Sequence, residues 1–256
     1  MILGLYQTPS PNGDLEAGLA TVETALHAAK AAGVDMLTMP EAFLPGYNAT
    51  PATPPKGWDT VEDRLSRLCA DCEIALTIGV PDYADGQIYN SAIAIDAAGK
   101  TLARYRKIQL FGPDETALYT PGNAYVTFTY RDICFGLLIR YDVEFPEHVR
   151  ALAGRGAEVI LVPTANMMPY INVNQVMVPA RAAENAVTIV FANYCGSEGA
   201  LDYTGLSAIH GPDGYILGGK GQGEGLCIAE LPHGPDGWSE HAIPLSTQRA
   251  DLKVVT

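Results

Sequence analysis

Short β-branched runs alternate with amphipathic helical stretches along most of this chain. Residues 2–7 read as a strand, and residues 14–31 carry apolar side chains at steps of four and three, the spacing of one helix face. These side chains are Leu15, Leu19, Val22, Leu26 and Ala29. Asn12 or Asp14 can cap the start of this helix, and residues 34–39 form the next strand. Alternation of this kind predicts an α/β fold in which helices lie on sheets.

The same pattern continues along the rest of the chain. Further strands are expected over 74–80, 88–96, 125–129, 133–140, 157–162, 187–192, 205–210 and 224–230, with helices over 60–70, 145–154 and 174–185. No linker or shift in composition marks a boundary, so we expect a single domain over 1–256. Residues 232–256 have little periodicity and are expected to form a C-terminal arm.

Charge and apolar content limit the partners of this protein. Acidic residues outnumber basic ones by 29 to 16, and the net charge is -13. Nucleic acids and anionic membranes select clustered Lys and Arg, so neither is expected as a partner. No apolar run approaches the length of a membrane span, and the first residues lack the features of a signal peptide. Five unevenly placed cysteines give no disulfide framework, and together these features predict a soluble cytoplasmic protein.

Three separated segments carry residues suited to catalysis. Glu41 lies in PEAFLPGY at the end of a predicted strand, where α/β folds gather functional side chains. Lys107 and Glu115 lie in the segment 104–115, and Arg140 ends a predicted strand in GLLIRYDVEFPE. Each segment alone is weak evidence, because a lone glutamate or lysine is usually solvated. Their order along the chain is the informative feature.

In order and spacing, Glu41, Lys107 and position 140 resemble the Glu-Lys-Cys triad of the nitrilase superfamily, the carbon–nitrogen hydrolases. In that family's pattern, the residue before Tyr-Asp is the nucleophilic cysteine, whereas here it is Arg140. Later blocks also agree, and they are VPTAN at 162–166, PARAAEN at 179–185, ANYCG at 192–196, GLSAI at 205–209 and GPDG at 211–214. The resemblance runs from residue 2 to about residue 230.

The resemblance implies a four-layer αββα sandwich and an amidase-like hydrolase that needs no metal or organic cofactor. It assigns Glu41 as the general base and Lys107 as the group that stabilises the oxyanion, with help from the backbone N–H of Tyr141. Glu115 matches a second glutamate beside the first. The substrate expected from the resemblance is a small-molecule amide. Asn166, Tyr47 and the pair at 167–168 are expected to line its pocket.

Arg140 itself cannot act as the nucleophile, because a guanidinium stays protonated and has no lone pair to donate. Cys134 cannot replace it, since six residues of strand place it about 20 Å away. An unpaired guanidinium is costly to bury, so we expect Arg140 to hydrogen-bond a nearby carboxylate, Glu41 first or otherwise Glu115.

Two classes of function remain open. One is an amidase whose nucleophile is lost in this sequence, which a single base change in a Cys codon can cause. The other is a pseudoenzyme that binds a carbonyl ligand or a protein partner without turnover. The retained Glu41, Lys107 and Glu115 favour the hydrolase. Within the hydrolases, nitrilase and N-carbamoyl amidohydrolase activities are alternatives to the amidase.

The resemblance also implies a homodimer or a multiple of it. The helices predicted over 145–154 and 174–185 carry apolar stripes that could pack on a partner. The arm from Pro232 has too little periodicity for a core of its own, and a twofold partner would stabilise it.

Overall fold

Two six-stranded sheets form the centre of the molecule. The computed structural model describes residues 1–232. In spatial order, the first sheet contains β14 (Gly225–Glu230), β1 (Ile2–Gln7), β2 (Met36–Thr38), β3 (Ala75–Ala84), β4 (Gln87–Ile95) and β5 (Thr101–Arg106). The second contains β13 (Ile216–Gly219), β12 (Ala208–His210), β9 (Thr188–Ala192), β8 (Val159–Pro163), β7 (Ile133–Leu137) and β6 (Thr127–Tyr130). A small hairpin pairs β10 (Ser197–Glu198) with β11 (Leu201–Asp202).

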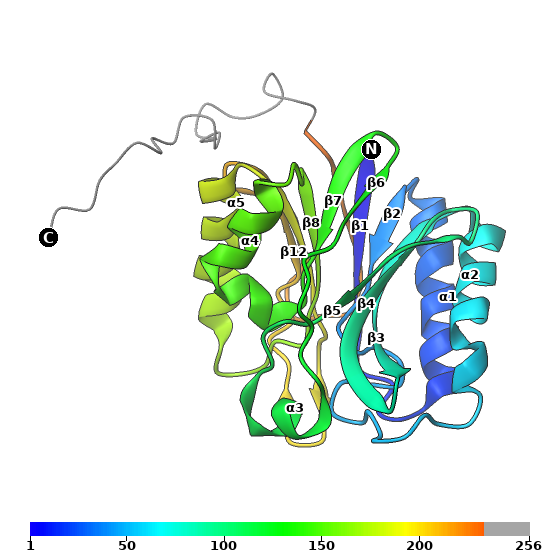
Figure 1. Ribbon diagram of the computed structural model, residues 1–256. Helices are drawn as coiled ribbons and strands as arrows, with labels where there is room; N and C mark the ends of the chain where they lie inside the picture. Colours follow the sequence, from blue (N-terminus) through cyan, green and yellow to red (C-terminus); the bar gives the residue numbers. More distant parts are fainter. Residues whose placement is uncertain (233–256) are drawn as a thin grey trace, which may run out of the picture.

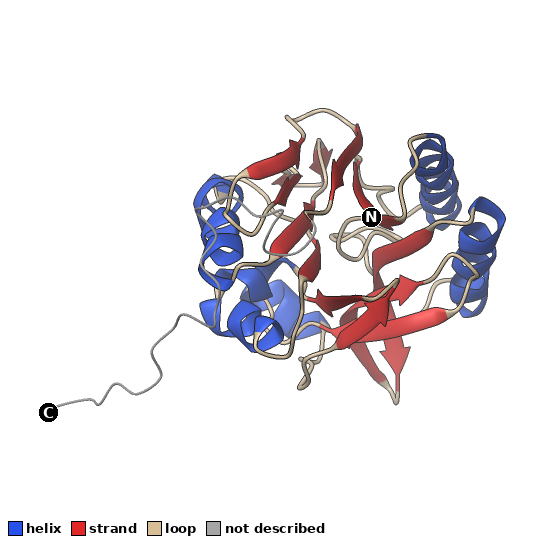
Figure 2. Ribbon diagram, turned by 90° about the horizontal axis from the view of Figure 1, so that it is seen from above, coloured by secondary structure: helices blue, strands red, loops and turns tan. Residues whose placement is uncertain are grey.

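Helices cover the outer face of each sheet (Figures 1 and 2). The first sheet is covered by α1 (Leu15–Ala31) and α2 (Val61–Cys72), and the second by α4 (Pro146–Ala153) and α5 (Val178–Asn185). A shorter helix, α3 (Gly112–Leu118), lies at one end of the sandwich, and η1 (Trp58–Thr60) is a single 3₁₀ turn. The predicted αββα sandwich is therefore confirmed.

The long N-terminal helix forms as its sequence predicts. Asp14 is its cap and accepts the backbone N–H of Ala17 at 3.0 Å, which satisfies one of the free donors of the first turn. The predicted apolar face is the buried one, and Val22 and Leu26 have no exposed surface. Burial of each such side chain contributes about 1.5–3 kcal/mol, and this fixes α1 against the sheet.

The core between the sheets is continuous and apolar. Every residue of β8 and of β9 is buried, as expected for parallel strands covered on both faces. Phe128 and Phe135 stack across β6 and β7 with ring centroids 5.3 Å apart. This rigid packing fixes the strand ends from which the site described below is built.

The boundaries of two elements differ from the prediction. The strand expected over 133–140 ends at Leu137, and a 3₁₀ turn, η2, covers Arg140–Glu144. The helix expected over 174–185 begins with a π turn, η3 (Val173–Met177). Pro179 lacks the N–H that an α-helix would direct to Gln175, which interrupts the regular ladder there.

Several short elements have no counterpart among the predicted strands and helices. They are the helix α3, the strand β13, the β10–β11 hairpin and the turn η1. The C-terminal arm predicted over 232–256 lies, apart from Pro232, outside the described residues. Among the helices of residues 1–232, none is long and apolar enough to cross a membrane.

Candidate active site

Glu41, Lys107 and Glu115 meet in one buried cluster. Glu41 follows β2, Lys107 directly follows β5, and Glu115 lies in α3. The Lys107 Nζ donates to Glu41 Oε1 at 2.6 Å and to Glu115 Oε1 at 2.8 Å. None of the three residues is more than 4% exposed. The sequence grouped these side chains from segments far apart in the chain, and the structure places them in direct contact.

The Glu41 carboxylate is held on both oxygens. Its Oε1 also accepts the Asn90 side-chain amide at 2.7 Å, and its Oε2 accepts the backbone N–H of Ala165 at 2.9 Å. Burial raises the pKa of Glu41, an effect that Lys107 opposes and Glu115 adds to. A raised pKa suits a general base that must also release its proton. Asn90 was missed from the sequence, since it lies within a strand far from any motif.

The lysine keeps its charge in this buried position. Burial alone would lower the pKa of Lys107, but Glu41 and Glu115 outweigh it, and the pKa is raised. The result is a fixed cation enclosed by two carboxyl groups. Such a cation can stabilise an oxyanion in the absence of water.

Close backbone packing fixes the turn that carries Glu41. A Cβ atom on Gly79 of β3 would lie 2.3 Å from the backbone nitrogen of Ala42 and 2.5 Å from the Glu41 Cα. Only glycine permits this approach. Ala42 itself has a positive φ of 44°, and the Tyr194 hydroxyl donates to the Glu41 carbonyl at 2.8 Å. The turn therefore has little freedom to move.

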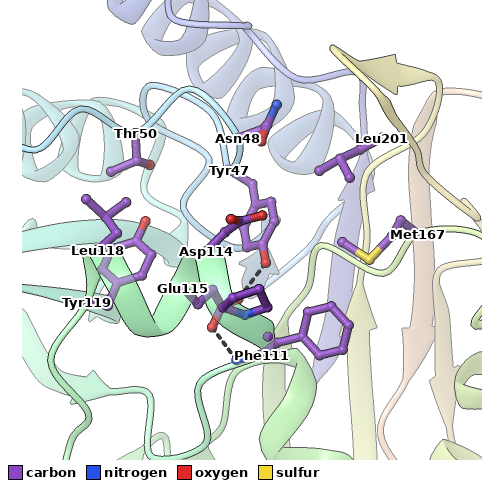
Figure 3. A pocket seen from close by; sticks show the side chains of 12 residues that line it. Tyr47, Asn48, Thr50, Phe111, Asp114, Glu115, Leu118, Tyr119, Met167 and Leu201 are labelled. Carbon is purple, nitrogen blue, oxygen red and sulfur yellow. Dashed lines mark hydrogen bonds between the residues drawn. The ribbon is translucent and has the colours of Figure 1, made fainter.

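A pocket of about 190 Å³ opens beside the cluster (Figure 3). Tyr47 and Glu115 lie in its wall, and the Tyr47 hydroxyl donates to Glu115 Oε1 at 2.6 Å. The backbone N–H of Phe111 donates to Glu115 Oε2 at 2.9 Å. Met167 also lines this pocket, as expected. Met168 and Asn166 were also expected in this lining, but neither is among the residues that line the pocket, and Met168 is 52% exposed.

Arg140 is fully buried, with 1% of its surface exposed. Its Nε and Nη2 both donate to Asn166 Oδ1, at 3.1 and 2.8 Å. Its Nη1 lies 3.3 Å from Glu144 Oε1, one turn further along η2. The expected hydrogen bond from Arg140 to Glu41 or Glu115 is therefore wrong. Lys107 already occupies both of those carboxylates, and the 3₁₀ turn brings Glu144 to the guanidinium instead.

Three aromatic rings surround the Arg140 guanidinium. The Cζ atom lies 4.3 Å from the ring centroid of Phe111, 5.3 Å from that of Tyr170 and 5.6 Å from that of Tyr141. The Phe111 and Tyr141 rings meet edge to face, with centroids 5.1 Å apart. Rings at these distances attract a cation through their quadrupoles. Phe111 and Tyr170 were not found from the sequence. Phe111 lies within the segment 104–115, but only the charged residues of that segment suggested catalysis, and Tyr170 lies in a loop without a motif.

Asp142 holds the turn that presents Arg140. Its carboxylate accepts the Tyr105 hydroxyl at 2.8 Å, the backbone N–H of Gln109 at 2.8 Å and that of Ile139 at 2.9 Å. Burial raises the pKa of Asp142 to about 6, and Lys107 opposes this rise. This carboxylate therefore ties the turn after β7 to the segment after Lys107.

Asn166 links the Arg140 side chain to the strand ends of the second sheet. Its side-chain amide donates to the Tyr170 carbonyl at 2.9 Å and to Asn174 Oδ1 at 2.6 Å. These two bonds fix the orientation of the Asn166 side-chain amide, so that its Oδ1 atom faces the Arg140 guanidinium. Within residues 1–232, no group of three or more His, Cys, Asp or Glu is placed to hold a metal ion.

The family model for carbon-nitrogen hydrolases matches residues 2–234 of this chain. The chain belongs to the carbon-nitrogen hydrolase family. A hydrolase encoded in the pqqF 5′ region of Pseudomonas protegens is 39% identical over 237 residues, which cover 90% of this chain and 82% of the relative. An (R)-stereoselective amidase of a Pseudomonas species is 34% identical, with 90% and 85% covered.

Solved structures of amidases have the same fold as this carbon-nitrogen hydrolase. An amidase from Nesterenkonia sp. superposes with a TM-score of 0.87 at 36% identity, and 91% of this chain and 90% of that chain are covered. Another structure, with a TM-score of 0.86, the same identity and 91% of each chain covered, is a cysteine-to-alanine variant of the Nesterenkonia sp. AN1 amidase in complex with butyramide. The two-sheet sandwich is thus shared with an amidase of the nitrilase superfamily.

Proposed function

We propose that this carbon-nitrogen hydrolase has an active site for small amides, and that the chain with Arg140 does not turn them over. The observation that supports this most is the contact of buried Glu41, Lys107 and Glu115. Together they supply a base of raised pKa, a cation for an oxyanion and a second carboxyl group. Only a nucleophile is lacking.

Position 140 belongs to the same site as this cluster. Phe111 connects them, because its backbone N–H binds Glu115 and its ring lies against the Arg140 guanidinium. Ala165 and Asn166 make a second connection, since the Ala165 N–H binds Glu41 and the Asn166 side chain binds Arg140. A short nucleophilic side chain at position 140 would share these surroundings.

With cysteine at position 140, Glu41 takes the thiol proton and the thiolate sulfur attacks the amide carbon. Lys107 stabilises the oxyanion, and the backbone N–H of Tyr141 assists. The carbon–nitrogen bond then breaks, ammonia leaves with the proton from Glu41, and a thioester remains. Water attacks the thioester and gives a proton to Glu41. The carboxylic acid is released and the proton returns to the sulfur.

The test compares the chain with Arg140→Cys on aliphatic amides, with nitriles and N-carbamoyl amino acids in the same panel to cover the alternative hydrolase activities. We expect release of ammonia from amides by Arg140→Cys alone, because loss of a covalent nucleophile costs several orders of magnitude in rate. Arg140→Ala is the matched control. Equal turnover by the parent chain and Arg140→Cys would refute the assignment of position 140.

A pseudoenzyme that binds a carbonyl ligand or a protein partner is the second candidate. The close fit of Arg140 between Asn166 and three rings favours it, because the fold accommodates this residue well. A folded Arg140→Cys protein without any activity on the panel would support this candidate over the first.

We also propose a homodimer, or a multiple of it, that acts in the cytoplasm. Val176, in the π turn before α5, is 63% exposed and offers an apolar contact on the outer helical layer. Light scattering at micromolar concentration tests the assembly. A mass near the 27.2 kDa of one chain would reject the dimer.

A further inference from the structure

The surroundings of the Arg140 guanidinium have the composition of a site for an organic cation. Glu144 supplies a carboxylate at 3.3 Å, Asn166 supplies an acceptor oxygen, and three rings lie within 5.6 Å of the Cζ atom. We call these five residues the guanidinium box, and they are Phe111, Tyr141, Glu144, Asn166 and Tyr170. Carboxylate, amide oxygen and ring faces all favour a positive charge over a neutral group of the same shape.

The guanidinium box is in contact with the pocket described above. Phe111 belongs to both, because it lines the pocket and its ring lies 4.3 Å from the Arg140 Cζ. Tyr170 is 39% exposed, so the box lies near the surface on one side. The pocket and the box therefore share the Phe111 side chain as a common wall, and we expect a shorter side chain at position 140 to open a path between them.

The arginine side chain has the same number of atoms in line as a cysteine that carries one kind of acyl group. In the acyl-enzyme formed by the Arg140→Cys variant, the sulfur takes the place of the arginine Cγ, and the acyl carbonyl carbon takes the place of Cδ. The α-carbon of the acyl group then corresponds to Nε, and its β-carbon to Cζ. An amino group on that β-carbon corresponds to one of the Nη atoms. The thioester of a β-amino acid thus follows the arginine side chain atom by atom, apart from the carbonyl oxygen, which arginine lacks, and the second Nη atom, which the acyl group lacks.

We propose that the guanidinium box binds the ammonium group of short β-amino amides, of which β-alaninamide is the simplest, and that Arg140 occupies it as a substitute for that acyl group. The claim about turnover rests on the proposed function, whereas the claim about cation binding does not. Glu144 supplies the negative charge, Asn166 supplies an acceptor, and the rings exclude water around the ammonium group.

Binding is tested first, without catalysis. Arg140→Ala removes the atoms that ethylguanidinium replaces, and ethylurea is the neutral probe of the same shape. By calorimetry, we expect ethylguanidinium to bind at least about tenfold more tightly than ethylurea, as one charge-assisted contact in a partly buried site provides. Adding Glu144→Gln should bring the two affinities to within about threefold. If Arg140→Ala does not fold, Arg140→Met with guanidinium and urea as probes replaces it.

Equal binding of charged and neutral probes, or a preference that survives Glu144→Gln, would overturn the proposal. So would the absence of any binding to a variant whose circular dichroism is that of the parent chain. None of these outcomes depends on amide hydrolysis, so the proposed function can fail while the cation site remains supported.

Turnover provides the second test. β-Alaninamide and butyramide have the same number of heavy atoms and differ only in an ammonium group against a methyl group. With Arg140→Cys, we expect kcat/KM to be at least about tenfold higher for β-alaninamide, and Glu144→Gln in that background to abolish the preference. A preference for butyramide would overturn the substrate class. Loss of activity on both amides in Arg140→Cys alone would reject the proposed function instead.

Discussion

Replacing Glu144 by glutamine leaves the buried Arg140 guanidinium without a carboxylate. The shape of the side chain is kept, so the loss is mainly electrostatic. Removing one partner of a fully buried ion pair costs about 3–5 kcal/mol. Two features of this pair reduce that figure. The Glu144 side chain is 17% exposed, and its contact with Arg140 at 3.3 Å lacks hydrogen-bond geometry.

These features place the expected cost of Glu144→Gln at about 2 kcal/mol of the free energy of unfolding, since Asn166 and the rings still stabilise the cation. For a chain of this size, that lowers Tm by roughly 4–8 °C. Urea denaturation followed by circular dichroism gives the free energy, and a thermal scan gives the midpoint.

The chain contains a matched control for this measurement. Arg181 and Glu184 also form a close pair, at 3.2 Å, but the Glu184 side chain is 37% exposed. Glu184→Gln should therefore cost less than about 1 kcal/mol. In an Arg140→Met background, Glu144→Gln should lose most of its effect, because no buried cation remains. Equal costs at Glu144 and Glu184, or an unchanged cost in the Arg140→Met background, would refute this reasoning.

Two further predictions concern the fixed parts of the site. The pKa of Asp142 is raised from 3.8 to about 6, so the folded chain holds this proton more tightly than the unfolded chain does. The stability that the protonated carboxyl group contributes is therefore complete only below the unfolded pKa of 3.8, and it is lost as the pH rises through 6. Relative to Asp142→Asn, the parent should lose about 2 kcal/mol between pH 4 and pH 7 in urea titrations, and parallel curves would contradict this. Gly79→Ala should cost about 1–3 kcal/mol, because its Cβ would lie 2.3 Å from the Ala42 nitrogen, and Gly223→Ala, with nothing within 4 Å, should cost almost nothing. Equal unfolding midpoints for these two glycine variants would show that the turn at Glu41 adapts freely.

Much of the fold could be predicted because its main signals are local. The face of α1 and the buried runs of β8 and β9 follow directly from hydrophobic spacing. The contact of Glu41 with Lys107 was expected from the order of the motifs. By contrast, the π turn before α5 lies where Pro179 lacks an N–H, and β7 gives way early to a turn in which Asp142 accepts the N–H of Ile139. Hydrophobic periodicity reports neither feature.

The partners of Arg140 could not be predicted for the same reason. Glu144 reaches the guanidinium only because Arg140–Glu144 forms a 3₁₀ turn, and the sequence placed the first of these residues at a strand end. Phe111 and Tyr170 reach it from two loops that are far apart in the sequence, and their rings meet edge to face. The cost of burying an unpaired guanidinium indicated that Arg140 needed a carboxylate, but the sequence could not choose among carboxylates that come together only in three dimensions.

Because β1 pairs with β14, the first sheet cannot be completed until residues 225–230 have been synthesised. β1 is made first, yet one of its two neighbours is β14, which joins it antiparallel from Ile2 opposite Glu230 to Gln7 opposite Gly225. At about 5–20 residues per second, a ribosome needs roughly 10–45 s to make the intervening chain. Throughout that interval, one edge of β1 has unpaired N–H and C=O groups that can join a strand of another nascent chain. Crowded polysomes are therefore the setting in which this chain is most exposed to mispairing, and a chaperone that shields the edge of β1 would act before the first sheet is closed.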